Sequence, residues 1–337
     1  MMMLELAIED AIFRIRREYE RTEGKIYLSF SGGKDSTVLA HLIMMADLPT
    51  PIPFVFGDTG IEMEATKRFV AEFDYPNKVT VKPRKPFAQV LKDHGKPSLS
   101  KLKSNGLKTY QRHLDEPLKT ARARQMILGV REKNGQQIPG RNSYRLPNHH
   151  MHFIHPDTEI KFSSLCCEHL KKYPLNRFEK ENDMRGVYTG VRTSEGGVRS
   201  LMYNSCVIVK KKRNKEFISS MPIIDWTDEL MSEFIDTYHI QLSDAYTVYG
   251  CDRTGCCGCP FSANLERDLE VLYKYEPKRY KAAMFWLEDV YHYQLVECQF
   301  DEEYMKRHRE RLPIIEQRRE EMLETYRDKE NRQLTLF

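Results

Sequence analysis

The sequence lacks the features of a membrane or secreted protein, and it has little net charge. No apolar run of about 18 residues is present, and the N-terminus carries no apolar region of the kind that directs secretion. The 53 Lys and Arg residues nearly balance the 49 Asp and Glu residues, so the formal charge of +4 does not identify a partner. We therefore expect a cytoplasmic protein without membrane contact, in which any basic surface is local.

Disulfide bonds are not expected in that compartment, which leaves the eight cysteines as metal ligands or reactive thiols. A length of 337 residues, of which 40% are hydrophobic, is enough to bury the core of one large α/β domain, with or without an appendage. We divide the chain into a domain over residues 1–262, which contains a basic insertion or lid at 96–155, and a charged helical extension over 263–337.

The stretch that dominates the chain is KIYLSFSGGKDSTVLAHL, residues 25–42, which contains a β-prone run, a glycine turn and a helix start. Two glycines allow a sharp turn and a close approach of backbone to ligand, and the first N–H groups of the helix point toward an anion. Hydroxyl groups add donors, and a lysine adds positive charge. We predict a phosphate-binding site here, although an ordinary strand, turn and helix would give a similar pattern. Its residues are Ser31, Gly32, Gly33, Lys34, Asp35, Ser36 and Thr37.

Alternation of strand-like and helix-like segments predicts a parallel, doubly wound α/β sheet, preceded by an amphipathic helix over residues 4–22. Asp58 and Gly60 follow the second strand, at the sheet edge where parallel sheets bind ligands. We expect Asp58 to bond a ribose or to hold Mg²⁺ on the phosphates and to face the same cavity as the glycine turn, unless it only caps a helix. The expected strands are 25–30, 53–56 and 79–82, and the expected helices are 37–45, 62–73 and 87–92.

Two segments are locally basic: residues 101–145 of the insertion and residues 210–215 at a predicted hairpin tip. Both segments suit binding of a polyanionic substrate or nucleic acid. For residues 101–145, an ordinary solvated surface explains the charge equally well, and for residues 210–215 it explains the charge better. The histidines that end the insertion lack carboxylates or cysteines at ligand spacing, so we interpret them as loop: His149, His150, His152 and His155.

The second half of the chain contains another strand followed by glycines. The strand is predicted at 187–191, and the glycine pair 196–197 follows it. Arg192 and Arg199 flank this pair, an arrangement that suits a second binding site for phosphate or sulfate. A surface turn with two solvated arginines is the alternative. Thr227 is the expected N-cap of a helix. The remaining expected elements are helices at 165–178 and 228–238, hairpin strands at 202–209 and 216–219, and C-terminal helices interrupted at Pro277 and Pro313.

Four cysteines on two distant segments form the other chemical pattern. Cys166 and Cys167 are adjacent, and Cys256 with Cys259 forms a CxxC pair, whose spacing favours Cys256 over Cys257. Four thiolates bind either zinc or an iron–sulfur cluster, so we expect the sulfurs of the two segments to lie within roughly 8 Å of one another. Buried, inert cysteines are the alternative.

SGGKDS, residues 31–36, resembles the PP-loop, SGGxDS, of the ATP pyrophosphatase superfamily, and it lacks the GxxxxGK(S/T) spacing of a Walker loop. Segments of the phosphoadenosine phosphosulfate (PAPS) reductase family are similar to CCEHLKKYPLNRF at 166–178, DTG at 58–60, GVRTSEGGVRS at 190–200 and PIIDWTDELMSEFI at 222–235. The resemblance covers about residues 25–261. It implies a PP-loop fold, an adenine nucleotide (ATP, PAPS or adenylyl sulfate), and a 4Fe-4S cluster, with zinc as the alternative, on Cys166, Cys167, Cys256 and Cys259.

Two departures from the family pattern separate the candidate functions. The reductases carry a nucleophilic cysteine in a C-terminal ECGxH motif, whereas this chain has Glu297-Cys298-Gln299-Phe300, and its PP-loop is the intact ATP-handling form. The leading hypothesis is an enzyme that cleaves ATP to AMP and pyrophosphate, adenylates an acceptor and supports sulfur transfer with a cluster. The alternatives are sulfonucleotide reduction through Cys298 or Cys251, and a non-catalytic nucleotide-binding accessory protein of a defence or mobile-element system. The C-terminal helices suit coverage of the core or oligomer assembly, and the residues expected in catalysis are Lys34, Asp35, Asp58 and Arg192.

Overall fold

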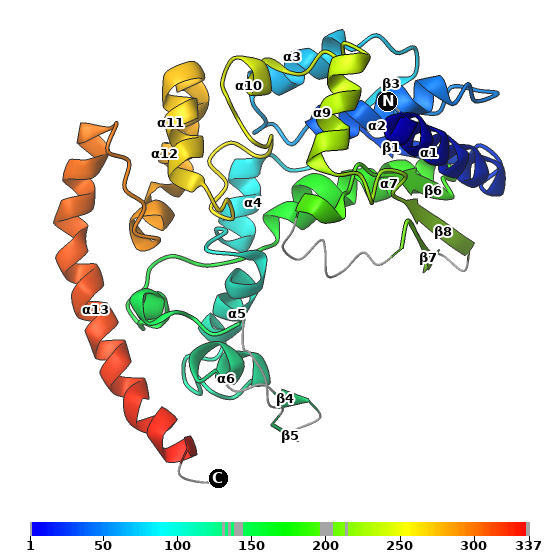
Figure 1. The fold of residues 1–337 in the computed structure, drawn as a ribbon. Coiled ribbons are helices and arrows are strands. Elements are labelled where there is room, and N and C mark those ends of the chain that lie inside the picture. The colour runs from blue at the N-terminus through cyan, green and yellow to red at the C-terminus, as the bar shows by residue number, and fades with distance from the viewer. Residues whose placement is uncertain are drawn as a thin grey trace. The chain divides into compact units, whose positions relative to one another are not determined.

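The computed structural model in Figure 1 describes residues 2–129, 132–133, 136–137, 144–195, 205–212 and 215–334. Its contacts divide the chain into two compact units. The sheet unit consists of Met1–Arg84 and Leu170–Gly255, and the helical unit consists of Lys85–His169 and Cys256–Phe337. In this division, residues 85–169, which contain the insertion, group with the C-terminal helices, and the expected domain boundary at residue 262 stays a prediction.

A mostly parallel sheet of six strands, in the order β3-β2-β1-β6-β8-β7, forms the centre of the sheet unit. Only the edge strand β7 is antiparallel, where it forms a hairpin with β8. Leu28 pairs with Phe54 of β2 on one side and with Tyr188 of β6 on the other, so β1 is a central strand. The strands are β1 Ile26–Ser29, β2 Phe54–Gly57, β3 Lys78–Val81, β6 Gly186–Tyr188, β7 Val207–Lys212 and β8 Lys215–Ser220.

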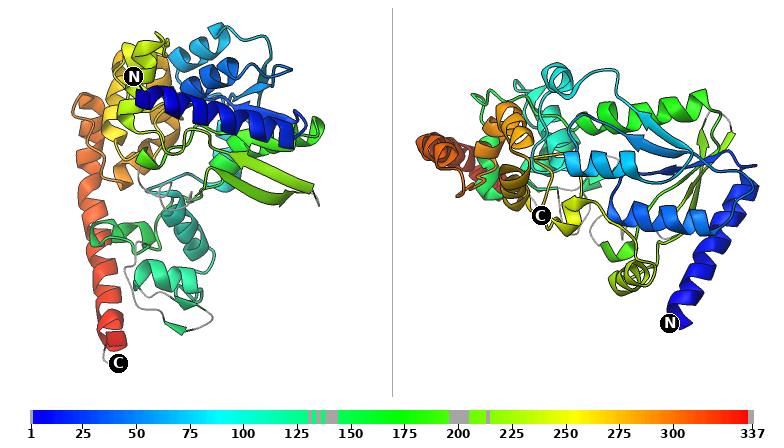
Figure 2. Two further views of the ribbon diagram at one scale, coloured as in Figure 1. Left: turned by 45° about the vertical axis from the view of Figure 1, so that its right-hand side comes forward. Right: turned by 90° about the horizontal axis from the view of Figure 1, so that it is seen from above.

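Helices cover both faces of this sheet, as Figures 1 and 2 show. Side chains of β1 alternate between the faces: Ile26 and Leu28 enter the larger core with α1, α2 and α9, whereas Tyr27 enters a smaller core with Phe178 of α7. The fold is therefore the doubly wound α/β class expected from the sequence. The helices of the unit are α1 Met2–Arg21, α2 Lys34–Met45, α3 Glu64–Glu72, α7 Tyr173–Glu181, α9 Asp228–Thr237, α10 Asp244–Thr247 and the 3-10 helix η3 Thr193–Glu195, and the π-helix η2 Glu168–Lys172 precedes α7.

The helical unit joins the insertion to the C-terminal helices through polar contacts between distant parts of the chain. His155 Nε2 lies 2.8 Å from Glu321, and Lys96 Nζ lies 2.7 Å from Asp289. These contacts explain why residues 85–169 belong with the C-terminus. The elements of this unit are α4 Phe87–His94, α5 Lys101–Gln111, α6 Ala121–Ile127, the short strands β4 Glu132–Lys133 and β5 Gln136–Gln137, the 3-10 helix η1 Asn148–Ile154, α11 Leu265–Tyr275, α12 Pro277–Tyr293 and α13 Glu302–Leu334.

Two local predictions differ from the structure, and one at Pro277 is confirmed. The helices are interrupted at Pro277, because α11 ends at Tyr275 and α12 begins at Pro277, where the missing N–H costs no hydrogen bond. Pro313, by contrast, lies inside α13 and does not interrupt it. The expected histidine loop is instead η1, in which His152 is fully buried and its Nε2 lies 2.7 Å from the Tyr293 carbonyl. By contrast, Thr227 caps α9 as expected, since its side chain accepts a hydrogen bond from the Leu230 amide.

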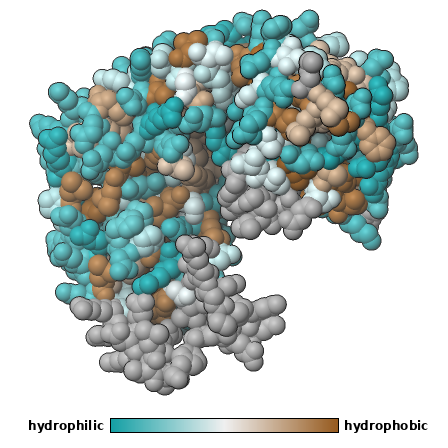
Figure 3. All heavy atoms as spheres, in the orientation of Figure 1, coloured by the Kyte–Doolittle hydropathy of each residue, from teal (hydrophilic) through white to brown (hydrophobic). Residues whose placement is uncertain are grey.

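Hydrophilic side chains occupy most of the face seen in Figure 3, with apolar side chains in scattered patches. This is the usual surface of a globular chain. None of the helices in the described part of the chain combines the length and the apolar composition that a membrane span requires.

Candidate functional site

A glycine turn links the end of β1 to the start of α2. Gly32 has a φ of +69°, in the left-handed region, and a Cβ there would lie 2.7 Å from Val70 Cγ2. Only glycine fits both the conformation and the space. Thr37 is fully buried, and its hydroxyl donates to the Gly33 carbonyl at 3.0 Å. Gly32 and Thr37 therefore shape the turn, and their predicted contact with a nucleotide stays a prediction.

The amides of the turn donate to neutral hydroxyl groups. The Gly33 amide donates to Ser31 Oγ at 3.3 Å, and the Lys34 amide donates to the Tyr246 hydroxyl at 3.1 Å. The Ser31 amide donates to Ser36 Oγ at 3.3 Å. Amides at the start of a helix favour anions, because they are donors at the positive end of the helix dipole. A phosphate oxygen could replace any of these hydroxyl acceptors.

A cavity of about 640 Å³ in the sheet unit opens at this turn. Five of the predicted PP-loop residues line it, and Arg192 lines it as well. Gly32, Thr37, Asp58 and Gly60 are not among the described residues that line the cavity, and Arg199 lies outside the described residues. The PP-loop residues at the cavity are Ser31, Gly33, Lys34, Asp35 and Ser36.

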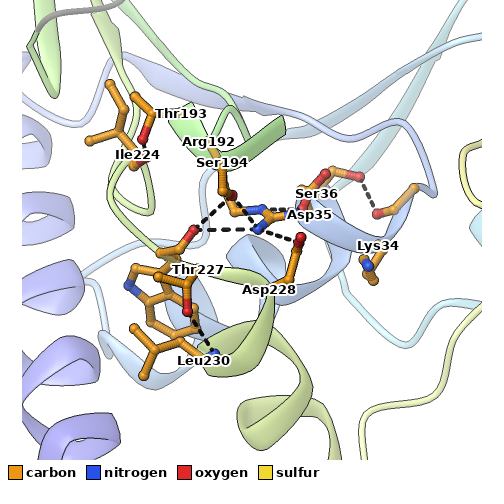
Figure 4. Close-up of polar contacts among 12 residues, drawn as sticks. Lys34, Asp35, Ser36, Arg192, Thr193, Ser194, Ile224, Thr227, Asp228 and Leu230 are labelled. Atoms are coloured by element: carbon orange, nitrogen blue, oxygen red, sulfur yellow. Dashed lines mark hydrogen bonds and ion pairs between the residues drawn. The ribbon is translucent and has the colours of Figure 1, made fainter. Parts of the chain in front are cut away.

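Arg192 is buried, with 3% of its surface exposed, and lies between two carboxylates (Figure 4). Its Nε donates to Asp35 Oδ1 at 2.7 Å, and its Nη1 lies 2.9 Å from Asp228 Oδ1 and 2.8 Å from Ser194 Oγ. Burial lowers the pKa of Arg192, but the negative charges and hydrogen bonds of Asp35 and Asp228 outweigh it and raise the pKa above its ordinary value. Arg192 thus fixes the first turn of α2 to the segment after β6.

Gly190 allows the segment after β6 to pack directly against the first turn of α2. A Cβ at Gly190 would lie 2.8 Å from the Asp35 carbonyl oxygen and 2.9 Å from the Ser36 amide nitrogen, so no side chain fits there. Sequence reasoning missed this role, although a glycine directly after a strand and before Arg192 is the signal that could have revealed it.

Asp58 lies at the carboxyl end of β2, beside β3. Its Oδ1 accepts a hydrogen bond from the Gly60 amide at 3.0 Å, and its Oδ2 lies 3.6 Å from Lys67 Nζ and 3.9 Å from Lys82 Nζ. The carboxylate is therefore held by its own turn and by two lysines. Its part in nucleotide or Mg²⁺ binding stays a prediction.

Helix α10 and the loop after it supply side chains that sequence reasoning did not assign to the nucleotide site. Tyr246, Asp252, Arg253 and Thr254 line the cavity, and so does Cys251. The signal for this role is the position of residues 251–254, which lead directly into the CxxC pair. Among the described residues, the cavity lining contains three cations, Lys34, Arg192 and Arg253, and three carboxylates, Asp35, Asp228 and Asp252, so their formal charges sum to zero.

The four predicted cysteine ligands lie in the helical unit. A hydrogen bond with Cys167, burial, and the nearby thiolates of Cys167, Cys259 and Cys256 raise the pKa of Cys166. The two cysteine segments are therefore neighbours in space. Within the residues that the structure describes, no group of three or more His, Cys, Asp or Glu side chains is arranged to hold a metal ion.

Cys298 is a poor candidate for a nucleophile. Its side chain is fully buried, and burial, followed by the charges of Glu266, Asp301 and Glu288, raises its pKa to about 12. Only the thiolate is an effective nucleophile, so this thiol is inert at neutral pH.

The predicted basic segments have mixed surroundings. At the hairpin of β7 and β8, Lys212 pairs with Glu179 at 2.6 Å and Lys215 pairs with Asp183 at 3.1 Å, so part of that charge is neutralised. Arg131, Arg141 and Arg213 lie outside the described residues.

Comparisons with known proteins agree with this arrangement. A family model described as the phosphoadenosine phosphosulfate reductase domain matches residues 25–137 and 144–262. An uncharacterized protein of Methanocaldococcus jannaschii is 35% identical over 256 residues, which are 74% of this chain and 39% of that protein. The chain thus spans about two-fifths of the length of that relative.

Two solved structures show a weaker likeness. The PAPS reductase of Candida auris, in a phosphate complex, has a TM-score of 0.41 and 16% identity over 72% of this chain and 86% of its own. The U34-tRNA thiolase of Methanococcus maripaludis, with its 4Fe-4S cluster, has a TM-score of 0.35 and 16% identity over 86% of this chain and 81% of its own. These scores are too low to carry an argument, whereas the family model matches well over half of the chain. The chain belongs to the phosphoadenosine phosphosulfate reductase domain family.

Proposed function

We propose that this chain is a PP-loop enzyme that binds ATP in the cavity of the sheet unit, cleaves it to AMP and pyrophosphate, and adenylates an acceptor for sulfur transfer. The observation that carries the proposal is the cavity of about 640 Å³ at the amino end of α2, which five of the six residues of the SGGKDS turn line. Its volume lies in the range of small-molecule sites. Membership in a nucleotide-using enzyme family supports an adenine nucleotide as the ligand.

The phosphates are assigned to the turn between β1 and α2. Ser31 and the amides of Gly33 and Lys34 would donate to phosphate oxygens, and Lys34 would add a mobile positive charge. Asp35 has a different role, because its carboxylate binds Arg192 and would repel phosphate. We assign Asp35 and Arg192 the positioning of the amides, which must point at the phosphates before the nucleotide arrives.

The charge of the cavity favours a nucleotide that arrives with a divalent cation. The three cations and three carboxylates of the lining cancel, so they offer no net positive charge to a triphosphate. Mg²⁺ bound to the phosphates would supply it, as in other sites that handle nucleoside triphosphates. The predicted ligand Asp58 is one candidate for an outer contact to this ion.

The proposed reaction is a displacement at the α-phosphorus. An oxygen of the acceptor forms a bond to that phosphorus while the bond to the bridging oxygen of the β-phosphate breaks, and pyrophosphate leaves with the electron pair. The acceptor is then an AMP ester. A sulfur nucleophile can attack the acceptor carbon, where a C–S bond forms while the C–O bond breaks and AMP leaves with the electron pair. Positioning and electrostatic stabilisation carry most of the catalysis of such transfers, which matches a rigid turn of amides.

Cys166, Cys167, Cys256 and Cys259 are the proposed ligands of a 4Fe-4S cluster. Four cysteines from two neighbouring segments are the donor set that such clusters use, and zinc is the alternative. A bound cluster would supply an electron-accepting iron site for the sulfur donor. Anaerobic purification with parallel iron, sulfide and zinc analysis tests this assignment, and Cys298→Ala serves as the control that should retain the metal.

Turnover separates this proposal from its competitors. The chain should release pyrophosphate and AMP from ATP in the presence of acceptor, and Gly33→Val should abolish the release. Binding of ATP without any turnover, with every candidate acceptor class, would instead identify a nucleotide-binding accessory protein.

A second candidate function, sulfonucleotide reduction, is favoured by one observation: Cys251 lines the same cavity as the PP-loop. Its thiolate would attack the sulfur of PAPS, form a cysteine S-sulfonate and release adenosine 3′,5′-bisphosphate, and a dithiol reductant would then liberate sulfite and become a disulfide. PAPS-dependent sulfite release that Cys251→Ser abolishes and Cys298→Ala retains would establish this reaction.

A further inference from the structure

The helical unit contains a cavity of about 610 Å³ that the proposed function does not use. The end of α4, residues 159–161, α12 and α13 line it. A short backbone bridge joins two of these segments, because the Lys96 amide donates to the Lys161 carbonyl at 2.7 Å. A Cβ at Gly95 would lie 2.4 Å from that carbonyl oxygen, so the wall of the cavity is closely packed.

Cations outnumber carboxylates in the lining, by five to two: Lys92, Lys96, Lys161, Arg311 and Arg318 against Glu159 and Asp289. The carboxylate of Asp289 is neutralised by Lys96 at 2.7 Å. Arg318 is held by a neutral partner, the hydroxyl of Tyr293, at 2.6 Å. Within the described residues, Lys161 and Arg311 are exposed and have no ion-pair partner.

Further positive charge lies next to the cavity, in the basic segment predicted from the sequence. Burial and then the charges of Arg112 and Lys161 lower the pKa of Lys108. Lys161, which lines the cavity, is therefore close to Lys108 of α5, and the positively charged region extends from the cavity toward α5.

The spacing of these cations suits several phosphates rather than one. Arg311 and Arg318 lie seven residues apart on α13, which is about 10.5 Å along the helix axis. Between them, Ile314 is 52% exposed and supplies most of the apolar wall that faces the cavity, since Ile160 and Ile315, which also line it, are only 6% and 3% exposed. An apolar wall between separated cations matches a chain in which phosphates alternate with bases or sugars.

We propose that this cavity binds the phosphodiester backbone of a single-stranded nucleic acid, with Lys161 and Arg311 contacting phosphates and the apolar wall contacting a base or sugar. A single strand can enter a concave site, whereas a duplex presents its phosphates on a convex surface. The proposal is independent of ATP binding in the sheet unit, and binding without ATP measures it directly.

The test is fluorescence anisotropy with labelled single-stranded oligonucleotides, one RNA and one DNA, and the full chain. The cavity variant Lys161→Ala/Arg311→Ala is compared with the control Lys278→Ala/Lys281→Ala, which removes two exposed lysines of α12 outside the cavity lining. We expect the cavity variant to lose at least tenfold in affinity and the control to lose less than twofold. Two lost phosphate contacts should also reduce the slope of log K against log salt by about 1.4.

Several results would overturn the proposal: no binding of either oligonucleotide by the wild type, equal losses in both double variants, or an unchanged salt slope in the cavity variant. Inorganic pyrophosphate and unlabelled oligonucleotide are also compared as competitors at equal phosphate concentration. If pyrophosphate displaces the labelled oligonucleotide as well as the unlabelled oligonucleotide does, the cavity is a site for small phosphates and the proposal is wrong. Because the exchanged side chains are exposed, the melting curves of the wild type and of both double variants should coincide. Arg311→Glu provides a further variant, which should bind the oligonucleotide more weakly than Arg311→Ala.

Discussion

The buried Arg192 and the half-buried Asp35 form an ion pair, with 2.7 Å between Nε and Oδ1, that joins the segment after β6 to the first turn of α2. Asp35 is a fixed position of the SGGxDS pattern, and the pair gives a physical reason for a carboxylate in a turn that is expected to hold phosphates. In the proposed site, the carboxylate would anchor the arginine that orients the amides rather than face the anion.

Exchanging Arg192 for lysine should weaken both nucleotide binding and the fold. Lysine keeps the charge but loses the planar group that contacts Asp35, Asp228 and Ser194 together. We expect a loss of about 1–3 kcal/mol in the free energy of unfolding and at least a tenfold loss in ATP affinity. Arg185→Lys, which changes a surface pair with Glu23, is the matched control. Equal ATP affinities in wild type and Arg192→Lys would exclude this positioning role.

Gly190→Ala should disrupt the site without adding charge or much volume. The new Cβ would press on the backbone of Asp35 and Ser36, which cannot move without tilting α2. Overpacking of this kind costs about 1–3 kcal/mol, and denaturant unfolding measures it. Gly57→Ala is the control, since a Cβ there meets nothing within 4 Å. If Gly190→Ala and Gly57→Ala were equally stable, the segment after β6 could move away from α2 at little cost, which would contradict the close packing at Gly190.

The sheet and the phosphate turn could be predicted from the sequence because local signals carry them. Thr227 caps α9, and the apolar positions of residues 4–22 form one face of α1, both of which depend on neighbouring residues alone. The glycine turn needed only its own φ requirement and the helix that follows.

Contacts between distant segments could not be predicted in the same way. The roles of Tyr246 and Gly190 depend on the approach of other segments to α2, and no local pattern encodes that approach. The association of the insertion with α13 depends on pairs such as His155 and Glu321, 166 residues apart, whose side chains are ordinary surface types. The amino-acid composition correctly predicts a charged C-terminal helix, but it does not predict that this helix packs against the insertion.

His152 should make the protein less stable in mild acid. Burial, then the charges of Arg319, His149 and Arg318, lower its pKa to about 4, although the hydrogen bond to Tyr293 opposes this. The unfolded chain binds a proton near pH 6.5 and the folded chain does not, so the free energy of unfolding falls as the pH drops from about 6.5 to 4, by up to about 3 kcal/mol.

Denaturant titrations between pH 7 and 4.5 check this expectation. His152→Gln can still donate to the Tyr293 carbonyl but cannot titrate, so its stability should fall less with pH than that of the wild type. His113→Gln is the control and should keep the slope of the wild type. A slope that His152→Gln leaves unchanged would assign the acid sensitivity to other groups.

Thiol labelling should distinguish Cys251 from Cys298. Cys251 lines the cavity, whereas Cys298 is fully buried and its pKa is raised to about 12. Iodoacetamide at pH 7.5, followed by peptide mass mapping, should modify Cys251 and leave Cys298 unmodified in the folded protein. Saturating ATP should slow the modification of Cys251. Labelling of Cys298 before Cys251 would contradict the assignment of the cavity thiol.

Calorimetric titration of the full chain with Mg²⁺-ATP tests the central claim, that the turn between β1 and α2 binds the phosphates of a nucleotide. A Cβ at Gly33 would lie 3.1 Å from Thr254 Oγ1 and 3.3 Å from the Tyr246 hydroxyl, so Gly33→Val places a branched side chain against the mouth of the cavity. We predict that the wild type binds ATP, that Gly33→Val loses at least tenfold in affinity, and that Lys34→Ala, at the variable motif position, loses less. A wild type that binds neither ATP nor PAPS, or a Gly33→Val variant that binds ATP as tightly as the wild type, would contradict the account.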